Sequence, residues 1–162
     1  MNQDERTKLI EEYGRGYDVL CAALDEIPRE AWEFKAAPTE WSVHELIVHM
    51  RDSEYVGVIR LHKLIAEPGS TLMPYDEGQW AQALNYQTVE MEDALEIFRL
   101  ARRTTHQLLR SLPERVFANE VVHPQWDKPY TMGDWLQIYV DHVPEHIAQL
   151  QQIHQAWKER TV

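Results

Sequence analysis

The chain has 162 residues, of which 44% are hydrophobic and 27% are charged. This composition is typical of a globular protein with a packed core, and it excludes a disordered or collagen-like chain. The length predicts a single domain over residues 1–162, because compact domains usually hold about 100–150 residues. Sixteen Lys and Arg stand against 27 Asp and Glu, and the resulting net charge of −11 argues against a nucleic-acid partner, whose binding depends on basic contacts.

The cysteine content and the apolar segments exclude further classes. Cys21 is the single cysteine, so the chain can form neither an internal disulfide nor a zinc site built from cysteines. The first residues lack the apolar segment of a secretion signal, and no stretch approaches the ~18 apolar residues of a membrane span. We therefore expect a soluble, cytoplasmic protein with no membrane partner.

The first half of the chain contains two segments with helical periodicity. The first extends from about Asp4 to Leu24 and carries one apolar stripe. The second begins at Ser42, where Glu45 three residues later completes a capping-box pattern, and it ends near Ala66. Residues 28–41 and 67–87 are loop-like, with a possible short helix over residues 76–84.

The second half repeats this organisation. A third helix is predicted from about Thr88 to Ser111, and a fourth begins at the capping-box pattern of Thr131 and Asp134 and continues nearly to the C-terminus. Residues 112–130 contain three prolines and room for a short extended stretch around residues 120–122. Together the four segments predict an all-α fold, an antiparallel four-helix bundle with long connecting loops and no substantial sheet.

Three of the eight histidines fall on or beside predicted core stripes. His142 and His146 occupy the centre of the apolar face of the fourth helix, and His49 flanks the stripe of the second, whereas His44 points nearly opposite. Two imidazoles at positions i and i+4 can bind one metal ion, because their β-carbons lie about 5–6 Å apart. An inward histidine can equally be an ordinary core residue, and the spacing alone does not fix the third ligand.

We assign no role to the remaining histidines and no metalloprotease motif to residues 142–146. The remaining histidines are expected to be surface or loop residues without a role: His62, His106, His123 and His154. Residues 142–146 also match the letters of the H-x-x-E-H metalloprotease motif. We discount this match because Pro144 interrupts the segment and only 16 residues follow His146, which leaves little room for a distant acidic ligand.

Several segments resemble the signatures of the DinB-like, or damage-inducible, superfamily. They are Trp41–Met50 (WSVHELIVHM), Pro74–Ala81 (PYDEGQWA), Tyr130–Trp135 (YTMGDW) and Asp141–His146 (DHVPEH). The resemblance covers about residues 10–155, and the order and spacing of the motifs make it more specific than any one of them.

This resemblance implies a four-helix bundle, often a homodimer, that holds a divalent metal with His49, His142 and His146. It also implies a small-molecule substrate and a metal-dependent enzyme, either a hydrolase or a transferase that uses a low-molecular-weight thiol. Nickel and zinc are the ions that it suggests, and imidazole ligands do not choose between them. The alternative is a non-catalytic, stress-associated metal-binding bundle. A coordination position left open would favour the enzyme, and closure by a fourth protein ligand would favour the structural reading.

Arg102 interrupts the apolar stripe of the third helix. An inward arginine can bind a carboxylate or phosphate of a substrate, so Arg102 is a candidate substrate-binding residue. The alternative is that it pairs with a carboxylate of the bundle or extends to the rim. Four aromatic residues are candidates for lining a cavity, although core packing is their more common role: Tyr55, Trp80, Tyr86 and Trp135.

Overall fold

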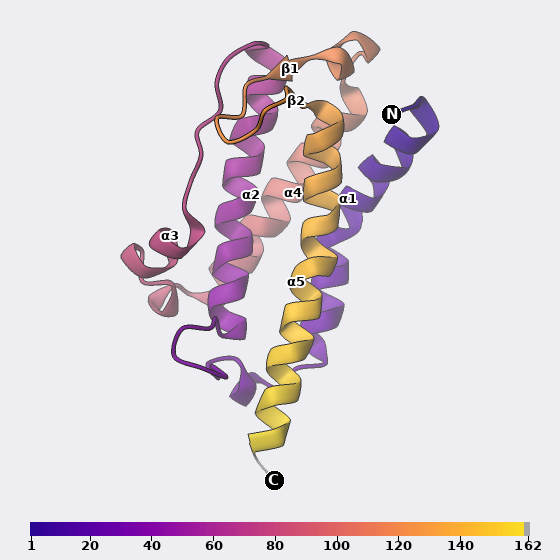
Figure 1. Ribbon diagram of the computed structural model, residues 1–162. Coiled ribbons are helices and arrows are strands. Elements are labelled where there is room, and N and C mark those ends of the chain that lie inside the picture. The colour runs from indigo at the N-terminus through magenta and orange to yellow at the C-terminus, as the bar shows by residue number, and fades with distance from the viewer. Residues whose placement is uncertain (161–162) are drawn as a thin grey trace.

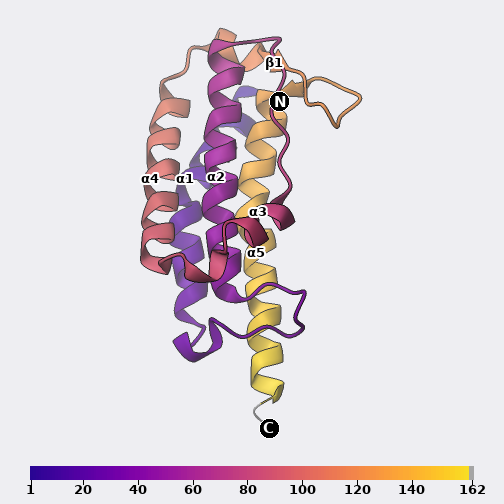
Figure 2. The same ribbon diagram turned by 90° about the vertical axis from the view of Figure 1, so that its left-hand side faces the viewer.

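The computed structural model describes residues 1–160, so the last two positions of the expected domain, 161 and 162, lie outside the described residues. Four long helices form the bundle: α1 (Gln3–Asp25), α2 (Val43–Ala66), α4 (Met91–Ser111) and α5 (Met132–Arg160). Figures 1 and 2 show them side by side along one axis. The expected helical bundle is confirmed, and the predicted ends of α1 and α2 fall within one residue of the observed ones.

Short elements fill the connections. They are η1 (Arg29–Ala31), α3 (Glu77–Ala83), η2 (Tyr86–Thr88), η3 (Glu114–Ala118), β1 (Glu120–Val121) and β2 (Tyr130–Thr131). The two strands form an antiparallel ladder in which Glu120 faces Thr131 and Val121 faces Tyr130. The short helix and the extended stretch expected from the sequence are therefore present, and the sheet is as small as predicted. The third long helix begins at Met91, three residues later than expected.

The helix directions follow from the long connection between α2 and α4. In Figure 1, α1 and α5 run downward whereas α2 and α4 run upward. The hydrogen bond between His44 Nε2 and the Val89 carbonyl (2.7 Å) joins the starts of α2 and α4. Each helix packs against one parallel and one antiparallel neighbour, around the ring α1–α5–α2–α4. The antiparallel arrangement predicted from the sequence thus describes two of the four main contacts, those of α2 with α5 and of α1 with α4.

Capping boxes fix where the two helices that matter for the site begin. The Ser42 hydroxyl accepts the Glu45 backbone N–H, and the Glu45 carboxylate accepts the Ser42 backbone N–H (2.9 Å). At the start of α5, Thr131 and Asp134 make the same reciprocal pair of bonds. Both boxes were predicted from the sequence, and they satisfy backbone donors that a helix start leaves without partners.

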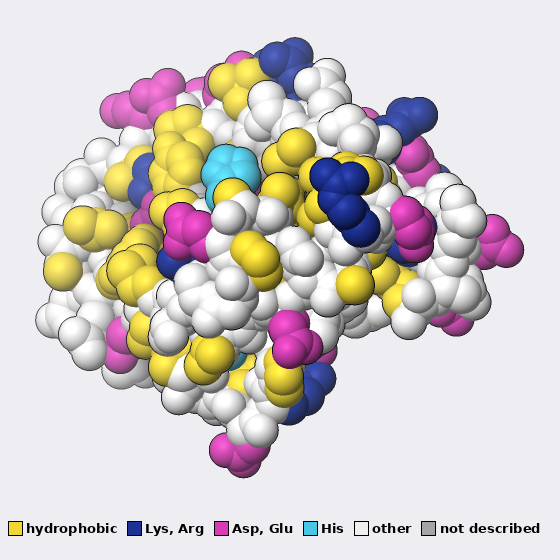
Figure 3. Space-filling model, turned by 90° about the horizontal axis from the view of Figure 1, so that it is seen from above, with side chains coloured by type: hydrophobic (Ala, Val, Ile, Leu, Met, Phe, Trp, Pro, Cys, Tyr) yellow, Lys and Arg dark blue, Asp and Glu magenta, His cyan; other side chains and the backbone are white. Residues whose placement is uncertain are grey.

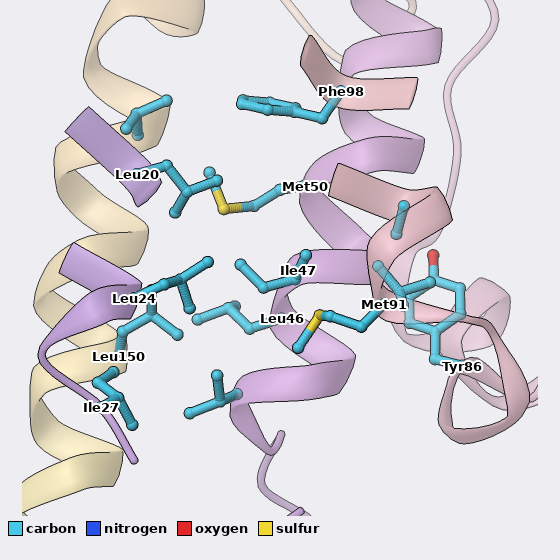
Figure 4. Close-up of a cluster of buried hydrophobic side chains, with 14 of the residues drawn as sticks. Leu20, Leu24, Ile27, Leu46, Ile47, Met50, Tyr86, Met91, Phe98 and Leu150 are labelled. Carbon is cyan, nitrogen blue, oxygen red and sulfur yellow. The ribbon is translucent and has the colours of Figure 1, made fainter. Parts of the chain in front are cut away.

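The core extends along the whole bundle. Its lower part is drawn in Figure 4, with contributions from α1, α2, α4, α5 and η2 that include Leu20, Leu24, Leu46, Ile47, Met50, Met91, Phe98 and Leu150. A second cluster surrounds Trp135, whose indole N–H donates to the Gly57 carbonyl (2.8 Å) and so ties α5 to α2. Viewed from above, charged side chains lie both around the edge of the molecule and within the face, among hydrophobic side chains and beside a histidine (Figure 3).

Three helical glycines, Gly14, Gly16 and Gly57, allow close approaches between helices. A β-carbon built on Gly57 would lie 2.5 Å from the ring of Tyr139, and one built on Gly16 would lie 2.2 Å from a guanidinium nitrogen of Arg102. Both distances are too short for any real contact, so the two side chains occupy space that only glycine leaves open.

The described helices include no segment that is both long and apolar enough to span a membrane.

Candidate metal centre

The structure brings His49, His142 and His146 together between α2 and α5. One ligand atom from each imidazole lies within 4.8 Å of the others. His49 and His146 are buried, with 1% and 9% of their surface exposed, and His142 is half-buried. His44 lies outside this group, as predicted, and its ring bonds to Glu33 and to the Val89 carbonyl. It is not solvated, however, because these contacts pack it against the base of α4.

The helix starts explain how the three imidazoles converge. Ser42 is the N-cap of α2, and His49 lies seven residues after it, two turns into the helix. In α5 the Trp135 bond to α2 and the packing of Tyr139 over Gly57 set the face that points inward, and His142 and His146 continue that face by one turn each. α5 continues through Pro144, so the two histidines remain on one helix.

Hydrogen bonds orient one imidazole of the three. The Nδ1 of His146 lies 2.8 Å from the Gln149 amide oxygen, which only accepts, so Nδ1 carries the proton and Nε2 keeps its lone pair. That Nε2 lies 2.9 Å from Nε2 of His142. The Nδ1 atoms of His49 and His142 are buried and have no hydrogen-bond partner among the described protein atoms.

All three imidazoles favour the neutral form. Burial, together with repulsion from His146, lowers the pKa of His49 to about 3. Burial also lowers the pKa of His142 well below its ordinary value, with smaller contributions from the charges of the other two histidines and Arg102. Burial lowers the pKa of His146 as well, against the opposing effect of the Gln149 hydrogen bond. Neutral imidazoles offer the lone pairs that a metal ion requires.

These observations test whether the residues fit a divalent ion. Three neutral imidazole nitrogens within a few ångströms of one another form a donor set suited to zinc, nickel, copper or iron. The bond from His146 to Gln149 has the role of the outer hydrogen bonds that orient metal-bound histidines. Buried imidazoles with nitrogens left unpartnered are costly in a protein core unless something else occupies them. The residues fit the ion.

A pocket of about 560 Å³ opens beside His146. Its described walls combine apolar groups with two carboxylates and two amides, among them Trp41, Leu46, Glu40, Glu77, Gln149 and Gln152. None of the four aromatic residues proposed from the sequence lines it. Tyr55 is 43% exposed on the surface, Tyr86 donates its hydroxyl to the buried Asp52 (2.8 Å), and Trp135 belongs to the core.

Arg102 is completely buried, and of the three histidines its charge acts on His142. Its Nε donates to the Glu54 carboxylate (2.9 Å), and its other two nitrogens donate to the carbonyls of Tyr13 (3.2 Å) and Tyr139 (2.7 Å). Glu54 also accepts the Tyr13 hydroxyl. The side chain therefore takes the alternative foreseen from the sequence, an ion pair with a carboxylate of the bundle, and each of its nitrogens is occupied.

One further histidine differs from expectation. His123 was expected at the surface or in a loop, and it lies in a loop but is only 5% exposed. Its ring packs against Trp126 and Tyr130 near the small sheet. The sequence around it predicted a short extended stretch over residues 120–122 and gave no sign that this loop folds back onto the end of the bundle.

Sequence reasoning missed three residues at the centre. Trp41 packs its ring 4.7 Å from that of His49, Gln149 binds His146, and a carboxylate oxygen of Glu77 lies 3.7 Å from Nε2 of His49. Gln149 follows His146 by three residues, so its helical position could have indicated the contact. Glu77 lies in the Pro74–Ala81 segment that carries part of the family resemblance, but nothing in that segment indicated a contact with a histidine of α2.

Comparisons with known proteins agree with this architecture. The structure of YfiT from Bacillus subtilis, described as having an unusual four-helix bundle topology, superposes with a TM-score of 0.88 at 22% identity, covering 98% of this chain and 90% of that one. In sequence, 70% of this chain aligns with the B. subtilis protein named "Putative metal-dependent hydrolase YfiT", at 26% identity. A protein of the same description from Oceanobacillus iheyensis is 29% identical over 68% of the chain.

These two alignments span 64% and 63% of the relatives' own lengths, which is less than two thirds. A relative from Bacillus licheniformis aligns more completely, at 24% identity over 93% of this chain and 86% of its own length. The model of the DinB superfamily matches residues 12–150. Since that match covers most of the sequence and includes all three clustered histidines, the chain belongs to the DinB superfamily.

Proposed function

We propose that this protein is a metal-dependent enzyme, most simply a hydrolase, that binds a divalent ion through His49, His142 and His146 and acts on a small molecule. The observation that carries the proposal is the convergence of three neutral imidazoles, two of them buried and one half-buried, beside a pocket large enough for a small ligand. The naming of the relatives as metal-dependent hydrolases supports the same class. Zinc and nickel are the ions that we expect.

In this proposal, different residues orient the ligands, hold them together and surround the substrate. Gln149 orients His146, and the packing of α2 against α5 holds His49 opposite the other two histidines. A divalent ion held there would lower the pKa of water and polarise a carbonyl or phosphoryl group of the substrate. The apolar side chains of Trp41 and Leu46 would exclude water from one side of the substrate, and the open side of the pocket admits it.

Three protein ligands favour the enzyme over a structural metal site. Structural zinc is usually closed by four protein ligands, whereas catalytic sites keep a position free. Among the described residues, the group of ligand atoms within 4.8 Å of one another contains the three imidazoles and no fourth side chain. Use of a low-molecular-weight thiol, assembly as a homodimer and location in the cytoplasm stay predictions from the family resemblance.

Metal titration of four single variants tests the proposal. We expect His49→Ala, His142→Ala and His146→Ala each to weaken Zn²⁺ binding by more than about 100-fold, because two imidazoles cannot replace three. His44→Ala is the matched control on α2, since its ring bonds to Glu33 and Val89 instead, and it should bind Zn²⁺ like the wild type. Equal binding by all four variants would refute the site, and loss confined to His44→Ala would refute the assignment of His49.

A further inference from the structure

The three-histidine cluster has a carboxylate at its edge that belongs to none of the long helices. Glu77 is the first residue of α3, and its Oε2 lies 3.7 Å from Nε2 of His49. It lines the same pocket as His146. Among the described residues, it is the only acid with a carboxylate oxygen within 4.0 Å of a ring nitrogen of the cluster.

The position of Glu77 differs from that of a fourth ligand. Ligand atoms that share one ion with bonds of about 2.1 Å lie at most about 4.2 Å apart. The cluster of mutually close ligand atoms leaves Glu77 out, although its carboxylate reaches one imidazole. Glu77 therefore lies just outside the donor set, on the pocket side, where a negative charge still acts on an ion between the imidazoles.

α3 is attached loosely to the rest of the molecule. None of its seven residues is buried, and only Trp80 and Ala81 pack against the core. Tyr75, just before the helix, stacks on Trp80 (ring centroids 4.8 Å apart), and the Asp76 side chain caps the helix start. Few buried contacts hold such a segment, so it opens more easily than the long helices. An added interaction at Glu77 would change its stability measurably.

We propose that Glu77 is an acidic residue of the metal centre, one that stabilises a bound divalent ion from outside the donor set and thereby holds α3 over the pocket. The inference rests on the proposed metal site. Three neutral imidazoles contribute no negative charge to balance a divalent ion, and Glu77 is the carboxylate placed to do so. Binding of the ion should then stabilise α3 in its position over the pocket, and α3 in that position should strengthen binding of the ion. Because the two are thermodynamically linked, the two effects are equal in free energy.

The first measurement is the affinity for Zn²⁺ by competition with a chromophoric chelator. Glu77→Gln removes the charge and keeps the shape, and we expect about tenfold weaker binding, as for other residues around a ligand set. Glu40→Gln is the matched control: Glu40 is exposed and lines the same pocket, but its carboxylate has no close contact with a described histidine. It removes the same charge from the chain and should change the affinity by less than about twofold.

The second measurement is hydrogen exchange of the backbone amides of residues 77–83, with and without Zn²⁺. In the wild type and in Glu40→Gln, Zn²⁺ should slow this exchange by up to about tenfold, the same factor by which Glu77 strengthens binding. In Glu77→Gln the exchange of α3 should not respond to Zn²⁺. This response separates a direct role at the metal centre from a merely structural role in α3.

The outcomes are distinguishable. If the wild type does not bind Zn²⁺, the proposed function and this inference both fall. If the wild type binds it and Glu77→Gln binds equally well, the inference alone falls. The inference also falls if Glu40→Gln loses as much affinity as Glu77→Gln, because the effect would then reflect the overall charge of the pocket.

Discussion

Two of the buried groups of polar side chains in this bundle differ in how completely their hydrogen bonds are satisfied. In the network around Arg102, each guanidinium nitrogen donates to a protein oxygen, and Glu54 accepts from two partners. In the three-histidine cluster, Nδ1 of His49 and of His142 have no partner among the described protein atoms. A satisfied network stabilises a fold, whereas buried ring nitrogens without hydrogen-bond partners destabilise it unless a bound group interacts with them.

The largest expected effect is a loss of folding stability when the hydrogen-bond network around Arg102 is broken. Arg102→Met leaves the Glu54 carboxylate buried with one hydrogen-bond donor, Tyr13, and removing one partner of a buried ion pair typically costs about 3–5 kcal/mol. We expect a loss of that size in the free energy of unfolding, measured by urea denaturation at pH 7.5 without metal.

Two further variants sharpen this comparison. The double variant Arg102→Met/Glu54→Leu removes both charges and should regain a large part of the lost stability. In the other cluster, His49→Leu removes an incompletely bonded imidazole and should cost far less than Arg102→Met. If Arg102→Met changed stability by less than about 1 kcal/mol, the network would not have the structural role that we assign to it.

The second prediction concerns the stability of the metal-free protein against pH. The pKa of His49 is about 3 in the folded protein because burial and the nearby His146 disfavour its charged form, and about 6.5 in the unfolded chain. Below pH 6.5 the unfolded chain takes up a proton that the folded protein does not, so stability falls as the pH drops towards 3. His49 alone should account for on the order of 2 kcal/mol between pH 7.5 and pH 5.

Chelator-treated protein, denatured with urea at several pH values, provides the test. His49→Leu is the control, since it lacks this group and retains the carboxylates that also titrate in acid. Its stability should decline less steeply between pH 7.5 and pH 5. Parallel curves for the two proteins would show that His49 is not held neutral by the fold.

The smallest predicted effect is a change in Zn²⁺ affinity when the hydrogen bond that orients His146 is removed. Gln149→Leu removes the acceptor for the Nδ1–H of His146 and should weaken Zn²⁺ binding about tenfold, the lower end of the range for residues that orient metal-bound histidines. Gln152→Leu is its matched control, because Gln152 lines the same pocket without a hydrogen bond to a histidine among the described residues. Equal affinities for both variants would contradict the role of Gln149.

The sequence predicted those features that depend on local periodicity. Capping boxes at Ser42 and Thr131 located the starts of α2 and α5, and the spacing of His142 and His146 placed both on the inner face of one helix. The position of His49 on the flank of its stripe followed from the same geometry. These features were accessible because each is decided within one helix.

Features that depend on how distant segments meet were not predictable in this way. Glu77 reaches His49 through a connection whose path no periodic pattern specifies. The parallel run of α2 and α4 depends on that same connection crossing the length of the bundle. For Arg102 the sequence left two possibilities open, and only the three-dimensional position of Glu54, 48 residues away along the chain, shows which partner it takes.

The close packing at Gly16 and Gly57 has a consequence for engineering this protein. Replacing glycine by alanine inside a helix is a common route to higher thermal stability, with a gain of up to about 1 kcal/mol at a suitable position. At Gly16 the added methyl group would enter the space of the Arg102 guanidinium, and at Gly57 that of the Tyr139 ring, one turn before His142. Substitutions chosen by helix propensity alone would therefore introduce clashes at both positions, with the buried Arg102 and with the tyrosine one turn before His142.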